Sequence, residues 1–202
     1  MDYDVTTQRI IAIVLAAGKA ERFGRTKLIA ELNGKPLLQY SLAAAQQACP
    51  GNVCLVAGHD ADKVIAAAAG IPDRVVVHSS YANGMGSSIA AGVDACATDA
   101  DAILLLLADQ PLITGQYLQQ LIQTWTGNDT EIIASGFDDV RSPPILFPEK
   151  SFTALRNLSG DQGARSVLAS DDFAVAVINC EDARFDIDRL ADLEFFDRNQ
   201  DG

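Results

Sequence analysis

The sequence has little positive charge, few histidines and no long apolar run. Its 202 residues include 15 lysines and arginines against 27 aspartates and glutamates, which gives a formal net charge of −12. A chain this acidic repels nucleic acid and anionic membranes, so we expect neither as a partner. The two histidines, His59 and His78, are isolated in the sequence. A histidine-based metal site or catalytic triad is therefore not expected.

Signals for export or membrane insertion are also lacking. Residues 1–9 are largely polar and carry two acids, and the apolar run that follows is too short to span a bilayer. The four cysteines, Cys49, Cys54, Cys96 and Cys180, are scattered without metal-ligand spacing, as is typical of reduced, mostly buried thiols. These features predict a cytoplasmic protein.

Short apolar runs alternate with helix-forming stretches along the whole chain. We expect strands at residues 10–15, 53–57, 74–77, 102–108, 131–134, 144–147 and 174–178, and helices at residues 36–48, 61–69, 87–97, 114–125, 152–158 and 160–169. This alternation predicts βαβ units and a mostly parallel sheet with helices on both faces. The expected fold is a three-layer α/β/α, Rossmann-like arrangement, with residues 1–202 as one domain and its core between residues 10 and 197.

The scarce positive charge is concentrated in one loop, directly after the first expected strand. Residues 18–27, GKAERFGRTK, carry a formal charge of +3, so the remaining residues carry −15. Ligands of open α/β sheets bind beyond the carboxyl ends of the strands. The small residues Ala16, Ala17 and Gly18 would let backbone amides approach a phosphate, and Arg22 and Lys27 would add charge. A glycine turn with solvated basic side chains explains the pattern equally well, so both interpretations remain open.

Two acidic segments are candidates for a cation site. Asp109 follows the run ILLLLA and precedes Gln-Pro, while Asp186 and Asp188 lie two residues apart in FDIDRLADL. Carboxylates at the carboxyl edge of a central strand would suit Mg²⁺ on a triphosphate. The alternatives are a turn residue for Asp109 and a helix N-cap for Asp188.

A glycine- and serine-rich loop follows the third expected strand. Gly86, Ser87 and Ser88 lie in YANGMGSSIAAG. Their hydroxyls and exposed amides could pair with the edge of a base, or the serines could simply cap a helix.

Two motifs resemble the signature of the sugar- and cofactor-nucleotidyltransferase superfamily. They are LAAGKAERFGRTK and LNGKPL, which match L-x-x-G-x-x-x-R-[MF]-G-x-x-K and L-x-G-K-P-L. The resemblance implies a glycosyltransferase-A-like sheet and a nucleotide-binding loop that starts at Leu15, with Ala16, Ala17 and Gly18. Arg22 and Lys27 would hold the triphosphate, with Lys27 at the α-phosphate.

The acidic segments resemble the same superfamily. LLADQP is similar to its metal-binding aspartate motif and FDIDRLADL to its closing F-D-I-D-T-P-x-D-L. The resemblance implies that Asp109 and Asp186 bind Mg²⁺ and that Asp188 caps a helix. Arg189 and Leu190 stand where Thr and Pro would be usual.

Further motifs are similar to the molybdenum cofactor cytidylyltransferases, the MocA-like branch of the superfamily. LAAG, VAGHDAD and GMGSSIAAG carry this resemblance. It implies CTP as co-substrate, with the base read by Gly86, Ser87 and Ser88, and a molybdopterin-type acceptor. A molybdoenzyme or its chaperone would be a further partner.

The segment GDQGAR resembles the acceptor side of the same branch and implies acceptor-side roles for Asp161 and Arg165. Ser142 and Pro143 replace the usual Gly and His nearby, which leaves the acceptor open.

Three alternatives were weighed against this interpretation. A guanylyltransferase, or a nucleotidyltransferase for another small acceptor, would keep the fold and change the substrates. A non-catalytic nucleotide-binding or cofactor-chaperone protein would not need Lys27, Asp109 and Asp186 together. An NAD-dependent oxidoreductase is disfavoured because the first loop lacks G-x-G-x-x-G and the second strand ends in Gly58 and His59 rather than in an acid.

Overall fold

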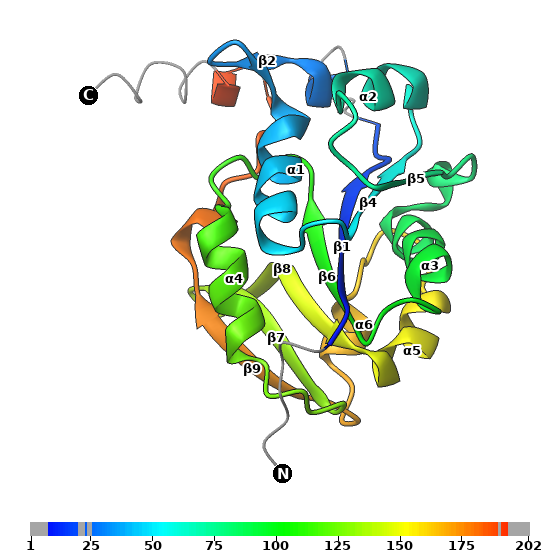
Figure 1. The fold of residues 1–202 in the computed structure, drawn as a ribbon, viewed down its shortest axis with the longest axis vertical. Coiled ribbons are helices and arrows are strands. Elements are labelled where there is room, and N and C mark those ends of the chain that lie inside the picture. The colour runs from blue at the N-terminus through cyan, green and yellow to red at the C-terminus, as the bar shows by residue number, and fades with distance from the viewer. Residues whose placement is uncertain (1–7, 20–22, 24–25, 190, 194–202) are drawn as a thin grey trace.

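The computed structural model of the protein describes residues 8–19, 23, 26–189 and 191–193. A seven-stranded sheet of order β5-β4-β1-β6-β8-β7-β9 forms its centre (Figure 1). The strands are β1 (Ile10–Ala16), β4 (Val53–Ala57), β5 (Arg74–Val77), β6 (Ala102–Leu107), β7 (Glu131–Phe137), β8 (Val140–Pro148) and β9 (Ala174–Asn179). All pairings are parallel except those of β8 with β6 and β7. The mostly parallel sheet predicted from the sequence is confirmed.

Helices cover both faces of the sheet, which gives the predicted three layers. One face packs against α1 (Leu37–Ala48), α2 (Ala61–Ala67) and α4 (Gly115–Thr124). The other packs against α3 (Met85–Cys96), α5 (Phe152–Arg156) and α6 (Arg165–Leu168). Helices α1 and α4 lie side by side in front of the sheet in Figure 1. Among the described residues, no helix is long and apolar enough to cross a membrane.

Short elements complete the chain at its connections. A small hairpin joins β2 (Glu31–Leu32) to β3 (Lys35–Pro36). The described residues also form the 3₁₀ helices η3 (Lys27–Ile29), η4 (Tyr81–Asn83), η5 (Glu149–Ser151) and η6 (Glu181–Arg184).

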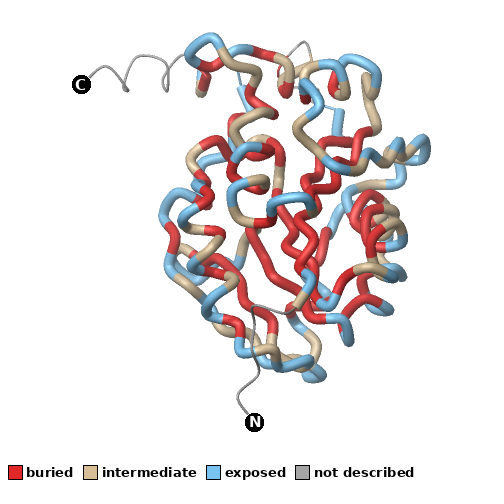
Figure 2. The backbone as a smooth tube through the Cα atoms, viewed as in Figure 1, coloured by how far each residue is buried: buried red, intermediate tan, exposed pale blue. Residues whose placement is uncertain are grey.

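The central strands are buried on both faces (Figure 2). In β1, Ala12 and Val14 point into the core under α1, whereas Ile13 and Leu15 point into the core under α3. Side chains of a strand alternate between the two faces, so a strand covered on both sides must be apolar throughout. This explains the unbroken apolar runs in β1 and β6.

Two expected elements differ from the structure. The helix expected over residues 160–169 begins only at Arg165, because Gly160 and Gly163 adopt left-handed backbone conformations, with φ of +69° and +58°. The strand expected over residues 144–147 is the end of a longer strand, β8, which begins at Val140 and pairs with β7 as an antiparallel hairpin.

Gly92 lets α3 approach the sheet closely. A Cβ atom at this position would lie 2.9 Å from Cγ2 of both Ile13 and Val56. Both neighbours are β-branched and fully buried, so they cannot turn aside without disturbing the core.

We therefore expect Gly92→Val to lower the free energy of unfolding by about 1–3 kcal/mol through overpacking. Ala91→Val is the matched control, because it places the same side chain on the same helix outside both core clusters. Urea denaturation followed by circular dichroism measures both variants. Equal stability losses would show that close helix–sheet contact is not the constraint at Gly92.

Candidate nucleotide and cation site

A cavity of about 880 Å³ opens at the carboxyl ends of the parallel strands. The pairing of β1 with β6 sets Leu15 opposite Leu107, so the loops that follow these strands start side by side. The cavity is lined by Leu15, Ala16, Ala17, Gly18, Lys19, Lys27, Leu28, Tyr81, Ala82, Gly84, Met85, Ser88, Leu107, Asp109, Asp161 and Asp188. It lies where ligands of open α/β sheets bind.

Most of the residues predicted from the sequence line this cavity. They are Leu15, Ala16, Ala17, Gly18, Lys27, Ser88, Asp109 and Asp161. Gly86, Ser87, Asp186 and Arg165 are not part of the lining, and Arg165 is an exposed residue at the start of α6. Arg22 lies outside the residues that the structure describes.

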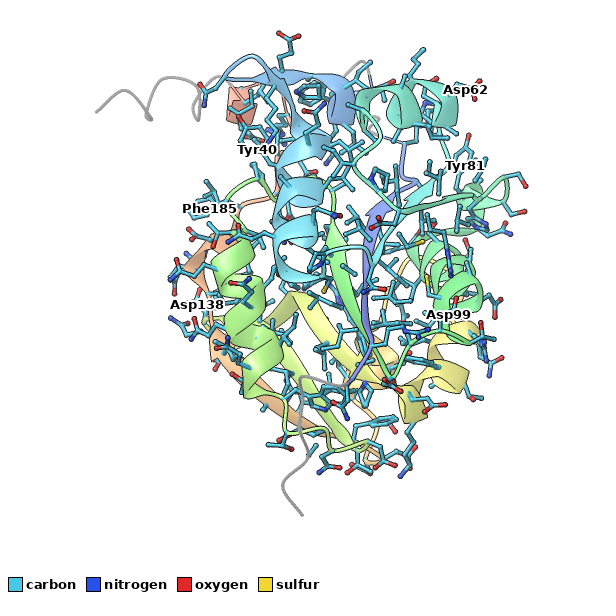
Figure 3. The ribbon with its side chains drawn as sticks, viewed as in Figure 1. Tyr40, Asp62, Tyr81, Asp99, Asp138 and Phe185 are labelled. Atoms are coloured by element: carbon cyan, nitrogen blue, oxygen red, sulfur yellow. The ribbon has the colours of Figure 1, made fainter. Side chains whose placement is uncertain are left out.

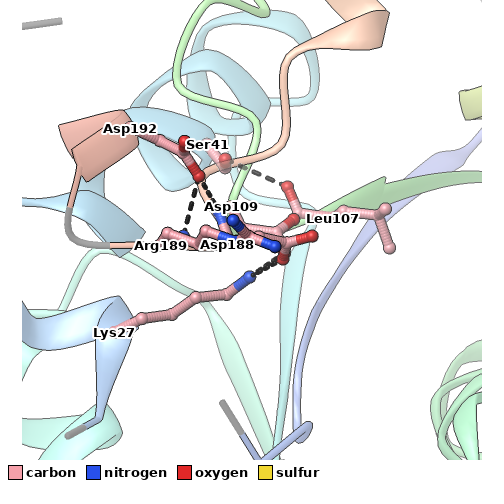
Figure 4. A network of polar contacts seen from close by, with 7 residues as sticks. All are labelled: Lys27, Ser41, Leu107, Asp109, Asp188, Arg189 and Asp192. Atoms are coloured by element: carbon pink, nitrogen blue, oxygen red, sulfur yellow. Dashed lines mark hydrogen bonds and ion pairs between the residues drawn. The ribbon is translucent and has the colours of Figure 1, made fainter. Parts of the chain in front are cut away.

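Lys27 bridges two carboxylates at the floor of the site (Figure 4). Its Nζ lies 2.7 Å from Oδ2 of Asp109 and 2.9 Å from Oδ1 of Asp188. Burial opposes the charge of the ammonium, but Asp109 and Asp188 more than offset this and raise the pKa of Lys27 above 10.5. Lys27 is therefore a permanent cation held between two acids.

The backbone around Lys27 and Asp109 is fixed by polar contacts. Thr26, just before η3, donates a hydrogen bond to Asp60 at the start of α2. The buried Ser41 of α1 donates to the carbonyl of Leu107, 3.1 Å away, at the end of β6 (Figure 4). Both partners of the ion pair thus extend from anchored segments.

The backbone and the side chain of Asp188 have different partners. Its backbone N–H and that of Arg189 both donate to Oδ2 of Asp192, at 3.0 and 2.7 Å, so Asp192 satisfies the amides at this chain turn. The Asp188 carboxylate is left to face Lys27 across the cavity.

The carboxylates fit a divalent cation that also binds a phosphate. Oδ1 of Asp109 is buried and has no hydrogen-bond partner among the described residues. Asp186 lies close enough to Asp109 to be perturbed by its charge. Within the described part of the chain, no group of three or more His, Cys, Asp or Glu could hold a metal ion. Mg²⁺ commonly takes one or two carboxylates and completes its shell with phosphate and water, so the Asp109–Asp186 pair suits it.

The pKa of Asp186 is raised to about 6. Asp186 is an exposed residue as a whole, but its carboxyl is partly removed from water, and this is the largest cause of the raised pKa, followed by the negative charge of Asp109. A cation between the two carboxylates would relieve both effects.

Two loops that are distant in sequence dock through their glycines on one wall of the cavity. Gly84 has φ of +95°, and a Cβ atom there would lie 2.4 Å from the carbonyl carbon of Gly160. The N–H of Gly86 donates to the carbonyl of Gly160 at 2.8 Å, and the N–H of Gly160 donates to Asn83 at 3.0 Å. This docking brings Asp161 into the same cavity as Ser88.

The two serines predicted to lie at the base, Ser87 and Ser88, belong to the first turn of α3 and face in different directions. The Ser87 hydroxyl donates to the carbonyl of Gly84 at 2.8 Å and lies 3.0 Å from Nε2 of His78. Ser88 is buried and lines the cavity. Of the two serines, Ser88 is therefore the one that faces the cavity.

Tyr81 and Met85 line the cavity but were not singled out from the sequence. Tyr81, labelled in Figure 3 beside β5, packs so close to Gly58 that a Cβ atom there would lie 2.7 Å from Cβ of Tyr81. Its hydroxyl lies 3.3 Å from Nδ1 of His59. Their position was the available signal, because Tyr81 in η4 and Met85 at the start of α3 both follow β5 closely in the sequence.

Comparisons with known proteins identify the family of the chain. The MobA-like NTP transferase domain family matches residues 12–175. Purine catabolism protein PucB of Bacillus subtilis strain 168 is 32% identical over 183 residues, covering 86% of this chain and 88% of that protein. Nicotine blue oxidoreductase of Paenarthrobacter nicotinovorans is 31% identical over 182 residues, with the same two coverages.

A solved structure is similar over nearly the whole chain. Rv0371c of Mycobacterium tuberculosis H37Rv, in complex with manganese, superposes with a TM-score of 0.76 at 27% identity, covering 96% of this chain and 100% of that one. A protein with this fold thus forms a complex with manganese.

The raised pKa of Asp186 predicts a pH-dependent cost in stability. The folded-state pKa of about 6 exceeds the ordinary 3.8, so ionisation is disfavoured in the folded protein. The destabilisation grows as the pH rises between these values and is complete above them. In metal-free buffer, Asp186→Asn should raise the melting temperature at about pH 7.5 and change it much less at about pH 4.

Asp171→Asn, in an exposed turn, controls for the loss of one negative charge. A gain for Asp186→Asn that is the same at both pH values, or no gain at neutral pH, would contradict the perturbed carboxyl.

Proposed function

This chain belongs to the MobA-like NTP transferase domain family, a family of nucleotidyltransferases, and on that premise we propose that it transfers CMP from CTP to the terminal phosphate of a molybdopterin-type acceptor. Pyrophosphate is the second product and Mg²⁺ the metal. The observation that carries the proposal is the Lys27 ammonium held 2.7 Å from Asp109, beside the small-residue loop of β1 in one cavity.

The reaction needs alignment and charge neutralisation rather than a general base. An oxygen of the acceptor phosphate, already ionised, attacks the α-phosphorus of CTP, and the bond from that phosphorus to the oxygen bridging to the β-phosphate breaks. The leaving pyrophosphate carries the electron pair away. Lys27 neutralises charge on the α-phosphate, and the amides of residues 16–18 cradle the triphosphate.

Asp109 and Asp186 are the residues that would hold Mg²⁺. The metal, when bound, shields the negative charge of the triphosphate and of the pyrophosphate that leaves. To meet the phosphate, Lys27 must exchange its contacts with Asp109 and Asp188 for contacts with the nucleotide. The incoming anion supplies the replacement partner, so the ammonium stays paired throughout.

The cytidine preference rests on the loop motifs LAAG and GMGSS. Ser88 and the backbone near Gly84 are the polar groups of that loop that line the cavity, and they suit the edge of a pyrimidine. The alternative is a guanylyltransferase of the same fold, and a preference for CTP or for GTP distinguishes the two.

The acceptor is proposed on the cavity and on the motif GDQGAR. Asp161 lines the cavity, and its carboxylate would accept hydrogen bonds from amino or hydroxyl groups of the acceptor. Arg165 would act from outside the cavity rim. The product would pass to a molybdoenzyme or to its chaperone.

A second candidate, an oxidoreductase, is favoured by the name of the relative that is 31% identical over 86% of this chain. It would need a redox cofactor such as a nicotinamide dinucleotide. The candidates therefore differ in the ligand that stabilises the protein.

A thermal-shift panel with CTP, GTP, ATP, UTP and NADPH, each with and without Mg²⁺, tests the proposal. CTP with Mg²⁺ at about 100 times its Kd should stabilise the protein by about 2.7 kcal/mol, which is several degrees for a chain of this size. Lys27→Ala and Asp109→Asn should abolish the shift, because they remove the triphosphate contact and the metal ligand.

Lys63→Ala, which removes an exposed lysine paired with Asp60, is the matched control and should shift like the wild type. A GTP-selective shift would assign the guanylyl reaction instead. A shift with NADPH alone would favour the oxidoreductase and overturn the transferase proposal.

A further inference from the structure

Gln110 is a buried polar side chain directly after Asp109. Only 1% of it is exposed, and its Nε2 donates to the carbonyl of Ala183 at 3.1 Å. This bond joins the end of β6 to η6, a segment 73 residues further along the chain. The proposed reaction gives Gln110 no contact with substrate, since it does not line the cavity.

A second bond joins the same two segments. The N–H of Ile187, which is fully buried, donates to the carbonyl of Asp109 at 3.0 Å. Asp186 lies between the two tethered residues, Ala183 and Ile187. Both tethers therefore end within three residues of Asp186. The separation of Asp186 from Asp109 is therefore set by contacts of residues 109 and 110.

Folding alone does not explain a glutamine at this position. Oε1 of Gln110 is buried and has no hydrogen-bond partner among the described residues. A buried unpartnered oxygen costs about 1–3 kcal/mol, which an apolar side chain of similar length would avoid. The amide is retained next to Asp109, whose own Oδ1 is likewise buried without a partner.

We propose that Gln110 is a positioning residue that holds Asp186 beside Asp109 and so determines the affinity of this carboxylate pair for a divalent cation. The inference rests on the cation site of the proposed function. Groups that orient metal ligands through hydrogen bonds commonly change metal affinity when they are replaced. Gln110 differs from such a group in that it holds the backbone of the segment that carries the ligand, through the carbonyl of Ala183.

The test is a titration of the nucleotide-free protein with Mn²⁺, followed by electron paramagnetic resonance of the free ion. Gln110→Met preserves length and volume but cannot donate to Ala183. We expect its Mn²⁺ affinity to fall by about 10–100-fold relative to the wild type. Gln110→Asn keeps an amide on a shorter side chain, and its Mn²⁺ affinity should also fall. This variant replaces Gln110→Met in the test if the methionine variant does not fold.

Ser151→Ala is the matched control for lost stability. Ser151 is fully buried and its hydroxyl donates to the carbonyl of Pro148 at 2.6 Å, outside the cavity lining. It should lose stability without losing Mn²⁺ affinity. A purely structural role for Gln110 predicts the same outcome for its variants.

The outcomes separate the inference from the function on which it rests. If the wild type binds Mn²⁺ and a folded Gln110 variant binds it with the same affinity, the positioning role is overturned and the proposed function stands. Absence of Mn²⁺ binding by the wild type, with and without CTP, overturns the cation site itself and the inference with it.

Discussion

The ion pair of Lys27 with Asp109 and Asp188 is the interaction on which the site depends. It joins the segment of Lys27 to two others, which lie 82 and 161 residues further along the chain. A permanent ammonium between carboxylates is stable while the site is empty, since each charge is compensated. Under the proposed function, the same ammonium would be available to a triphosphate, and Asp109 would be available to hold a divalent cation. Substrate binding in this account is an exchange of partners rather than the filling of a bare charge cluster.

Several polar groups of the site lower the stability of the folded protein. Oδ1 of Asp109 and Oε1 of Gln110 are buried without partners among the described residues, and the pKa of Asp186 is raised to about 6. Each of these features disfavours the folded state without a ligand. The apolar strands β1 and β6, buried on both faces, supply the rigid support that tolerates such groups at their ends.

Much of this arrangement could be predicted from the sequence, because it follows from local patterns. The apolar runs identified the parallel strands, and the rule that ligands bind at their carboxyl ends placed Lys27 and Asp109 together. Contacts between distant backbones could not be predicted in this way. The docking of Gly84 on Gly160 brings Asp161 into the nucleotide cavity, and no spacing encodes it. The choice between Ser87 and Ser88 depends on His78, a residue whose proximity only the folded chain reveals.

The central claim is that the Lys27 ammonium and a divalent cation compete for the Asp109 carboxylate, and a Mn²⁺ titration of Lys27→Met without nucleotide tests it most directly. Removing the competing charge should tighten Mn²⁺ binding by about tenfold or more, since opposite charges this close interact by one to several kcal/mol. Lys63→Met, which removes a lysine paired with Asp60, should bind Mn²⁺ like the wild type. Unchanged or weaker Mn²⁺ binding by Lys27→Met would show that Lys27 does not compete with the cation for Asp109, and would contradict the account.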